Sequence, residues 1–276
     1  METRYTADPE RFPRMTTDEL RKTFLVDSLF EPDRMPLIYS DIDRAIVGSA
    51  VPVKQSIPLA CPAELRSSFF AERREVGVLN VGGPGNVTVD GKTFAMNNRD
   101  GLYIGRGGRE VVFSSDKPAD PAAFYLLSYP AHREYPTAQV RMGEAWSATL
   151  GSDAECNRRV LRRYIHPDGI PSCQLVMGFT ELAEASVWNT MPPHTHGRRM
   201  EVYLYFDVPE GQAVFHLMGP PHETRHLVVR NRQAVLSPSW SLHSGVGTRP
   251  YAFVWGMGGE NQAFDDMDAV EVNRLL

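Results

Sequence analysis

Short apolar segments separated by turn-forming residues run along most of the chain. The 22 glycines and 21 prolines interrupt runs of β-branched and aromatic residues before any run is long enough for a regular helix. Such runs are typical of β-strands. The eleven runs that we predict as strands are Val76–Val81, Asn86–Val89, Gly101–Ile104, Val111–Phe113, Ala123–Ser128, Gln174–Glu181, Glu201–Phe206, Ala213–Met218, Leu227–Val229, Ala234–Leu236 and Tyr251–Trp255. This number of short strands predicts an all-β barrel or sandwich.

Helical signals are few. Thr16 and Glu19 have the spacing of a capping box ahead of apolar residues, which predicts one short helix there. A second short helix is possible at residues 155–164, where arginines alternate with apolar residues, and we interpret this arginine cluster as a solvated face or an interface. The polar, strand-poor stretch at 130–152 is a candidate linker.

The overall composition is that of a globular protein. Apolar residues make up 42% and charged residues 23% of the 276 residues, which excludes a fibrous or wholly disordered chain. The 29 basic and 34 acidic residues give a net charge of −5, so we expect no nucleic-acid partner. No apolar run approaches the length of a membrane span, and the polar N-terminus does not resemble a secretory signal. We therefore expect a cytoplasmic protein without a membrane partner.

Metal-binding residue types gather in the segment that ends at Glu201. His194 and His196 are two residues apart, so an extended strand would direct both imidazoles to one face. Glu201 opens the next predicted strand after a short turn, and its carboxylate can face the same point. Imidazole and carboxylate groups are common ligands of divalent metals, so these residues are three candidate ligands.

A fourth candidate ligand, His243, lies in a later segment after Pro238 and Trp240. The two stretches read H-x-H-x4-E and P-x-W-x-x-H. They resemble the two signature motifs of the cupin superfamily, in which a small β-barrel binds a metal through two His, one Glu and a distant His. Trp240 stands where the second motif prefers Gly, and Gly247 where it prefers Asn, but neither position is a ligand.

The first half of the chain repeats this pattern weakly and without the histidines. When Glu75 is aligned with Glu201, Ser68 and Phe70 occupy the positions of the two neighbouring histidines, and Glu110 falls opposite the distant one. The N-terminal copy is therefore predicted to lack a metal site.

The resemblance and the repeat together imply an all-β fold of two cupin-type barrels, with a few short helices. We predict an N-terminal cupin-like barrel without metal ligands at residues 1–135 and a C-terminal metal-binding barrel at residues 136–276.

Longer phrases of the sequence resemble one enzyme family, the 5-keto-4-deoxyuronate isomerases, also called 4-deoxy-L-threo-5-hexosulose-uronate ketol-isomerases. The phrases are Phe24–Val26, Tyr39–Arg44, Phe70–Val78, Trp188–His196, Arg198–Tyr203, Ser237–Gly247, Trp255–Gln262 and Phe264–Asp268. The resemblance extends from about residue 20 to the C-terminus.

This resemblance implies a zinc-dependent aldose-ketose isomerase of pectin and uronate breakdown. The reaction would convert 5-keto-4-deoxyuronate to 3-deoxy-D-glycero-2,5-hexodiulosonate. The resemblance also implies a homohexamer with one Zn²⁺ per chain. The zinc ligands that it implies are His194, His196, Glu201 and His243.

The chemistry of the residues is compatible with this activity. Moving a carbonyl by one carbon passes through an enediolate, whose charge a divalent cation stabilises, and a nearby base moves the proton. The sequence does not identify that base. A guanidinium is expected to bind the carboxylate of a uronate, and Arg199 is the arginine nearest to the ligands in sequence. Tyr203 and Tyr205 are candidates for lining the substrate site, although packing in the core is the expected role of at least one of them.

Three other functions remain open at this stage. The 5-deoxyglucuronate isomerase of inositol catabolism resembles the same family. Cupin sites with the same ligands also hold iron in dioxygenases. The third alternative is a sugar-binding barrel without catalytic activity.

Overall fold

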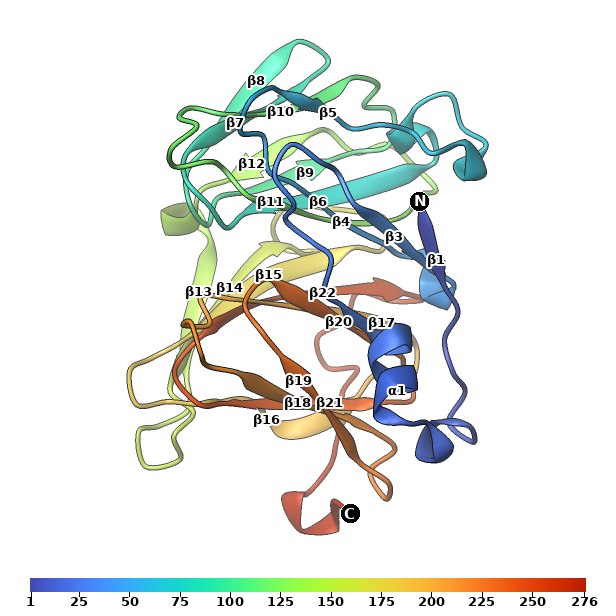
Figure 1. The fold of residues 1–276 in the computed structure, drawn as a ribbon, viewed down its shortest axis with the longest axis vertical. Coiled ribbons are helices and arrows are strands. Elements are labelled where there is room, and N and C mark those ends of the chain that lie inside the picture. Colours follow the sequence, from blue (N-terminus) through green and yellow to red (C-terminus); the bar gives the residue numbers. More distant parts are fainter. The chain divides into compact units, whose positions relative to one another are not determined.

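A computed structural model describes all 276 residues, which form two compact units (Figure 1). The first unit comprises Met1–Arg4, Ser28–Trp146 and Tyr164–Met177, and the second comprises Tyr5–Asp27, Ser147–Arg163 and Gly178–Leu276. Neither unit is continuous in sequence. The division into successive domains, 1–135 and 136–276, stays a prediction.

The first unit contains two layered sheets with a hydrophobic core between them (Figure 1). The seven-stranded sheet has the order β1-β3-β4-β11-β6-β9-β12, and the four-stranded sheet has the order β5-β10-β7-β8. The strands are β1 (Glu2–Arg4), β3 (Leu37–Ser40), β4 (Ile46–Ala50), β5 (Ile57–Pro58), β6 (Arg74–Asn80), β7 (Gly85–Val89), β8 (Lys92–Met96), β9 (Gly101–Ile104), β10 (Val111–Ser115), β11 (Phe124–Pro130) and β12 (Ala138–Val140). Val78, Phe113 and Phe124 are among the buried core residues.

The other two sheets lie mainly in the second unit. Their orders are β13-β14-β15-β22-β17-β20-β2 and β19-β18-β21-β16-β23. The strands are β2 (Leu25–Val26), β13 (Trp146–Leu150), β14 (Arg159–Ile165), β15 (Val176–Leu182), β16 (Trp188–Thr195), β17 (Arg199–Phe206), β18 (Val214–Gly219), β19 (Arg225–Val229), β20 (Gln233–Ser237), β21 (Leu242–Gly247), β22 (Ala252–Gly259) and β23 (Asp268–Ala269).

The same strand order occurs twice along the chain. The order β3-β4-β11-β6-β9 corresponds to β14-β15-β22-β17-β20, and β5-β10-β7-β8 corresponds to β16-β21-β18-β19. Consecutive strands from β3 to β11 therefore correspond, one by one, to those from β14 to β22. The prediction of an all-β chain with two cupin-type barrels and a few short helices is confirmed.

The predicted helix near Thr16 is α1 (Thr17–Phe24). The hydroxyl of Thr16 accepts a hydrogen bond from the Glu19 N–H, and the Glu19 carboxylate accepts one from the Thr16 N–H, which completes the capping box. Phe24 packs edge-on against Trp240, the residue that replaces the motif glycine. The 3₁₀ helices are η1 (Phe12–Arg14), η2 (Ile42–Arg44), η3 (Ala63–Leu65), η4 (Phe70–Glu72), η5 (Met142–Glu144) and η6 (Val272–Arg274).

Each of the eleven predicted strands overlaps a strand of the structure, but two other predictions were wrong. Residues 155–164 do not form a helix, because β14 starts at Arg159 and pairs with both β13 and β15. β-Branched Val160 and aromatic Tyr164 suit a strand, and pairing on both sides outweighs the weak helical pattern. The stretch 130–152 is more than a linker, since it contains both β12 and β13.

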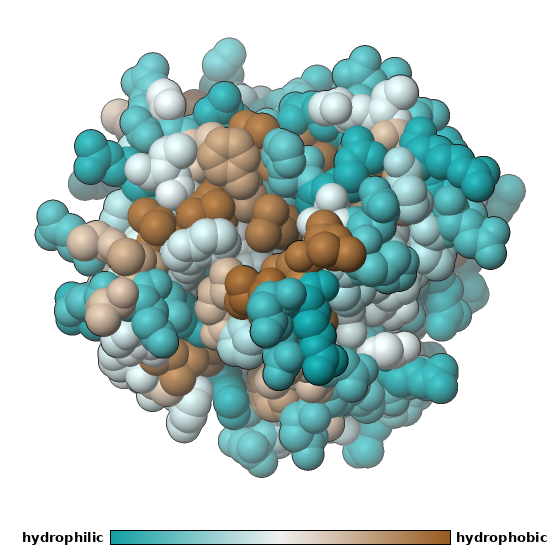
Figure 2. Space-filling view, turned by 90° about the horizontal axis from the view of Figure 1, so that it is seen from below, coloured by the Kyte–Doolittle hydropathy of each residue, from teal (hydrophilic) through white to brown (hydrophobic).

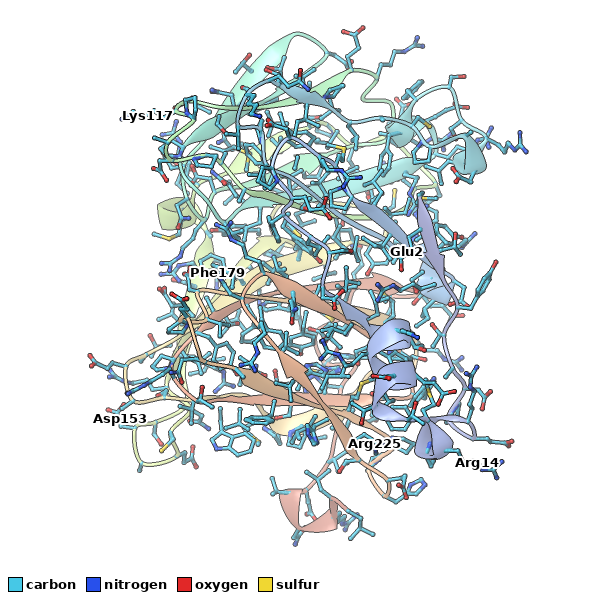
Figure 3. All side chains as sticks on the ribbon, viewed as in Figure 1. Glu2, Arg14, Lys117, Asp153, Phe179 and Arg225 are labelled. Atoms are coloured by element: carbon cyan, nitrogen blue, oxygen red, sulfur yellow. The ribbon has the colours of Figure 1, made fainter.

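The surface is predominantly polar with scattered apolar groups. Arg14 and Asp153 extend outward from the second unit (Figure 3), whereas Arg225 donates a hydrogen bond to the Met15 carbonyl oxygen. Figure 2 shows apolar side chains among hydrophilic ones on the side where Figure 1 places the C-terminus. The exposed large apolar residues of the second unit are Tyr5, Leu150, Phe215, Met267, Val272 and Leu276. No helix has the length and apolar character that crossing a membrane requires.

Candidate metal centre

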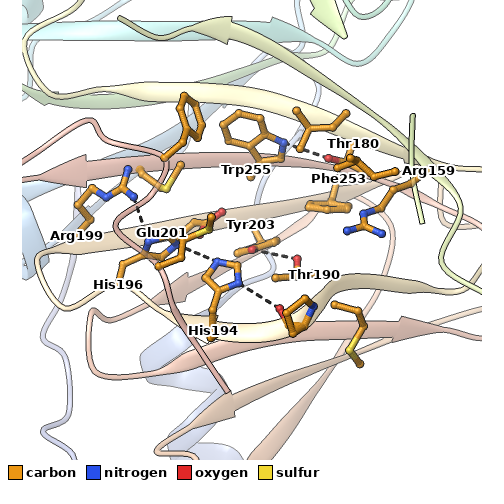
Figure 4. Close-up of a pocket in the computed structure, with 18 of the residues that line it drawn as sticks. Arg159, Thr180, Thr190, His194, His196, Arg199, Glu201, Tyr203, Phe253 and Trp255 are labelled. Carbon is orange, nitrogen blue, oxygen red and sulfur yellow. Dashed lines mark hydrogen bonds and ion pairs between the residues drawn. The ribbon is translucent and has the colours of Figure 1, made fainter. Parts of the chain in front are cut away.

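Four side chains from three strands and the turn after β16 converge inside the second unit. His194 lies near the end of β16, His196 follows that strand, and Glu201 lies in β17 (Figure 4). His243 lies in β21 and is the cross-strand partner of His194 in the antiparallel β16–β21 pair. The strand pairing therefore brings together residues that are 49 positions apart. His196, Glu201 and His243 are buried.

The four donor atoms surround one point. The Nε2 atom of His194 lies 3.1 Å from the Nε2 atoms of both His196 and His243. An oxygen of Glu201 lies 3.2 Å from Nε2 of His196 and 3.0 Å from Nε2 of His243. Ligands at 2.0–2.1 Å from one ion are separated by about 3.0 Å in octahedral and 3.3 Å in tetrahedral geometry. The observed separations are close to both values.

Hydrogen-bond partners behind the histidines leave the Nε2 lone pairs directed to that point. Nδ1 of His194 lies 3.3 Å from the carbonyl oxygen of Pro192, and Nδ1 of His196 lies 3.1 Å from that of Asp266. A carbonyl can only accept, so each contact favours a proton on Nδ1. The Nε2 lone pairs of His194 and His196 then face each other and the Glu201 carboxylate, and no proton lies between these three groups. A divalent cation fits this donor set.

The electrostatic environment favours the ligand protonation states. Burial raises the pKa of Glu201, but the neighbouring imidazoles of His243 and His196 hold that pKa well below its usual value. Burial, with His243 nearby, lowers the pKa of His194 to about 3. At neutral pH the carboxylate is therefore ionised and the His194 ring neutral, as metal binding requires.

The C-terminal segment supports His196 from behind. Nε of the fully buried Arg199 lies 3.3 Å from a carboxylate oxygen of Asp266. Nη2 of Arg199 is also 3.1 Å from Nδ1 of His196. This contact could be a hydrogen bond only if Nδ1 of His196 were the acceptor. The proton of that imidazole would then lie on Nε2 of His196. Metal binding through Nε2 selects the other partner, the Asp266 carbonyl.

Three of the four candidate ligands, His194, His196 and Glu201, line a cavity of about 420 Å³ (Figure 4). Cavities of this size suit small molecules, and they are commonly apolar with a few placed polar groups. The polar lining residues besides the ligands are Arg159, Arg163, Thr180, Thr190, Arg199 and Tyr203. None of these is a carboxylate or an imidazole. Most of the remaining wall is apolar, and it includes Leu161, Phe253, Trp255, Met257 and Phe264.

Tyr203 and Tyr205 have different surroundings. Tyr203 lines the cavity, and its hydroxyl lies 3.3 Å from that of Thr190. Burial and the Glu201 carboxylate raise the pKa of Tyr203 well above its usual value, so its hydroxyl keeps its proton. Tyr205 does not line the cavity, and its hydroxyl lies 2.7 Å from Nδ1 of the buried His216. The structure therefore places only Tyr203 within reach of a ligand in the cavity.

An irregularity in β16 places Thr190 at the cavity. The pairing with β21 shifts register between Asn189 and His194, and Thr190 has a φ of 51°. A β-branched residue rarely adopts this left-handed conformation, and such strain is common at functional sites.

Two arginines of β14 line the cavity although they were not predicted as site residues. Arg159 and Arg163 line the cavity with Leu161 between them, so alternate residues of β14 face inward. The two-residue spacing was a usable signal, but the helical interpretation of this segment concealed it. Asp266 carried no comparable signal, because only the folded chain brings it to His196.

Comparisons with known proteins identify the family of this chain. A family model described as the KduI/IolB family matches residues 32–273. Proteins from Caldicellulosiruptor bescii and Shouchella clausii, both named 4-deoxy-L-threo-5-hexosulose-uronate ketol-isomerase, are 50% and 53% identical to this chain over 275 residues. Each match covers all of both chains.

A solved structure has a similar fold. An IolB-like protein from Salmonella typhimurium LT2 aligns with a TM-score of 0.72 at 15% identity, covering 91% of this chain and 97% of its own. At that identity the likeness concerns the fold alone. The family model covers most of the sequence, and the full-length relatives share half of its residues, so this chain belongs to the KduI/IolB family.

Proposed function

We propose that this protein is a zinc-dependent ketol-isomerase that converts 5-keto-4-deoxyuronate to 3-deoxy-D-glycero-2,5-hexodiulosonate. The main supporting observation is the convergence of three imidazoles and one carboxylate on one point, where His194, His196 and Glu201 line a cavity sized for a small molecule. The full-length relatives named for this type of reaction supply the substrate class.

His194, His196, Glu201 and His243 would hold the metal. The bound cation supplies a Lewis acid that stabilises negative charge on adjacent substrate oxygens. The surrounding side chains orient the substrate and limit the access of water. The hydroxyls of Tyr203 and Thr190 can donate hydrogen bonds to substrate oxygens beside the ligand cluster. Phe253 and Trp255 belong to the apolar wall of the cavity, which excludes water and so strengthens these polar contacts.

Turnover assays with and without a chelator test the proposal. The zinc-loaded protein should convert 5-keto-4-deoxyuronate, as followed by NMR. A chelator should abolish conversion, and added zinc should restore it. Absence of chelator-sensitive conversion would contradict the proposal.

The same assays separate the alternatives. Preferential turnover of 5-deoxyglucuronate would assign the protein to the inositol pathway. Iron-dependent oxygen consumption would indicate a dioxygenase, whereas isomerisation under nitrogen with zinc supports the proposal. Binding of a uronate without any turnover would indicate a sugar-binding protein.

The resemblance also supports a homohexamer in the cytoplasm. Sedimentation of the purified protein should give the mass of six chains, and cell fractionation should recover it with the cytosolic enzymes. A monomeric mass at micromolar concentration would contradict the assembly.

A further inference from the structure

Three arginines line the cavity, and their existing partners differ. Arg199 is paired with the Asp266 carboxylate and packs against a ligand histidine. The guanidinium of Arg163 lies 4.0 Å from the centroid of the Phe264 ring. Arg159 donates one hydrogen bond, from Nη1 to the carbonyl oxygen of Asn157 at 2.9 Å, and forms no ion pair. Of the three, Arg159 has the most capacity to bind an anion.

Arg159 is also partly withdrawn from solvent. Burial lowers the pKa of its guanidinium, although Tyr251, Tyr203 and Glu155 act in the opposite direction. A guanidinium remains charged in proteins, so Arg159 is an incompletely compensated cation in a largely apolar cavity. Its planar fork of N–H donors matches the geometry of a carboxylate.

The position of Arg159 suits a ligand that also reaches the metal centre. Figure 4 shows Arg159 at one end of the cavity and Arg199 with His196 at the other, with Tyr203 and Phe253 in between. An elongated sugar acid could therefore place its reacting carbonyl near the ligand cluster and its carboxylate near Arg159. An unpaired carboxylate against the apolar wall would be strongly disfavoured.

We propose that Arg159 forms the carboxylate-binding end of the cavity and so selects sugar acids over neutral sugars. This proposal rests on the proposed function for the location of the reacting end. It gives Arg199 a different role from the one expected from the sequence, because Arg199 and Asp266 position His196. Arg159→Gln removes the charge, and Arg159→Lys keeps the charge but removes the planar fork.

A ligand-binding comparison tests the proposal without turnover. Dissociation constants of D-galacturonate and D-galactose would be measured by NMR titration on the zinc-loaded native protein and its variants. The native protein should bind the uronate about 10- to 100-fold more tightly, since a hydrogen-bonded charge pair contributes that much. Arg159→Gln should remove most of this preference, and Arg159→Lys should restore part of it.

Arg162→Gln is the matched control. Arg162 lies on the same strand but does not line the cavity, and it pairs instead with Glu181 at 3.4 Å and with the ring of Phe179. This variant should keep the uronate preference. A preference that survives in Arg159→Gln, or its absence from the native protein, would overturn the proposal.

Kinetics separate this proposal from the proposed function. With 5-keto-4-deoxyuronate, Arg159→Gln should raise KM about 10- to 100-fold, with a smaller change in kcat and unchanged zinc content. A purely structural role would lower zinc content or thermal stability instead. If the native protein does not turn over this substrate, the proposed function fails, while the binding comparison still decides the role of Arg159.

Discussion

The two halves of the repeated strand order each contain a buried glutamate near the start of the same strand. Glu75 lies in β6 and Glu201 in β17, which are equivalent by strand order. Glu75 accepts hydrogen bonds from the backbone N–H groups of Cys173, Gln174 and Leu175 and from the Tyr103 hydroxyl. Glu201 instead faces His196 and His243.

This difference separates a structural carboxylate from a candidate metal ligand. Both side chains are buried, so burial alone does not indicate function. The four donors to Glu75 satisfy a buried charge within the first unit, which ties residues 173–175 to β6. The Glu201 carboxylate instead lies beside the imidazoles of His196 and His243, and these three groups can bind one cation. The partners of a buried carboxylate therefore decide its role.

The largest effect on stability should come from Glu75→Ala. This change leaves three backbone N–H groups and one hydroxyl without their acceptor, so we expect a loss of about 3–5 kcal/mol in the free energy of unfolding. Urea denaturation would measure it. The folded variant should bind as much zinc as the native protein, and a loss of zinc would contradict the distinction between the two glutamates.

The corresponding change in the second unit is His243→Ala, which should affect metal binding. Zinc sites with four protein ligands contribute roughly 10–16 kcal/mol, so one ligand corresponds to about 3 kcal/mol, or more than 100-fold in affinity. Isomerase turnover should fall together with zinc affinity. Retention of native zinc affinity by this variant, measured by competition with a chromogenic chelator, would rule out His243 as a ligand.

Three of the candidate ligands could be predicted from short-range periodicity, whereas His243 and the weak repeat were found only by comparing segments with the cupin motifs and with each other. His194 and His196 share a strand face through the two-residue period, and Glu201 follows one turn later. Other contacts depend on the tertiary fold. The N–H donors to Glu75 lie about 100 residues downstream, as the 100-position separation from Leu175 shows. Nothing local in the sequence could pair them.

A moderate effect is expected from Asp266→Asn. The change weakens the ion pair that holds Arg199 beside His196, and loss of such support commonly reduces metal affinity 10- to 100-fold. We expect about tenfold, because the Asp266 backbone carbonyl remains in place. The exposed neighbour Asp265 provides the matched control, Asp265→Asn, which should leave zinc affinity unchanged. Equal zinc affinities of the two variants would argue against a positioning role for the Asp266 carboxylate.

The smallest effects should come from a matched pair of hydroxyl deletions. Tyr103→Phe removes one of four donors to Glu75 and should cost about 1–2 kcal/mol of stability without reducing kcat/KM. Tyr203→Phe removes a hydroxyl from the cavity wall and should lower kcat/KM about tenfold with little loss of zinc. Thermal unfolding and steady-state kinetics on both variants would check the two predictions. A loss of kcat/KM in Tyr103→Phe, with only a loss of stability in Tyr203→Phe, would contradict the roles given to the two hydroxyls.

The most direct measurement is X-ray absorption spectroscopy at the zinc edge of the purified, zinc-loaded protein, combined with metal quantification per chain. We predict one zinc ion per chain, with imidazole nitrogens and carboxylate oxygen at about 2.0–2.2 Å and no sulfur ligand. His243→Ala should lose one imidazole from this shell, whereas Glu75→Gln should leave the spectrum unchanged. A sulfur-containing shell, or a native spectrum in His243→Ala, would contradict a metal centre formed by these four side chains.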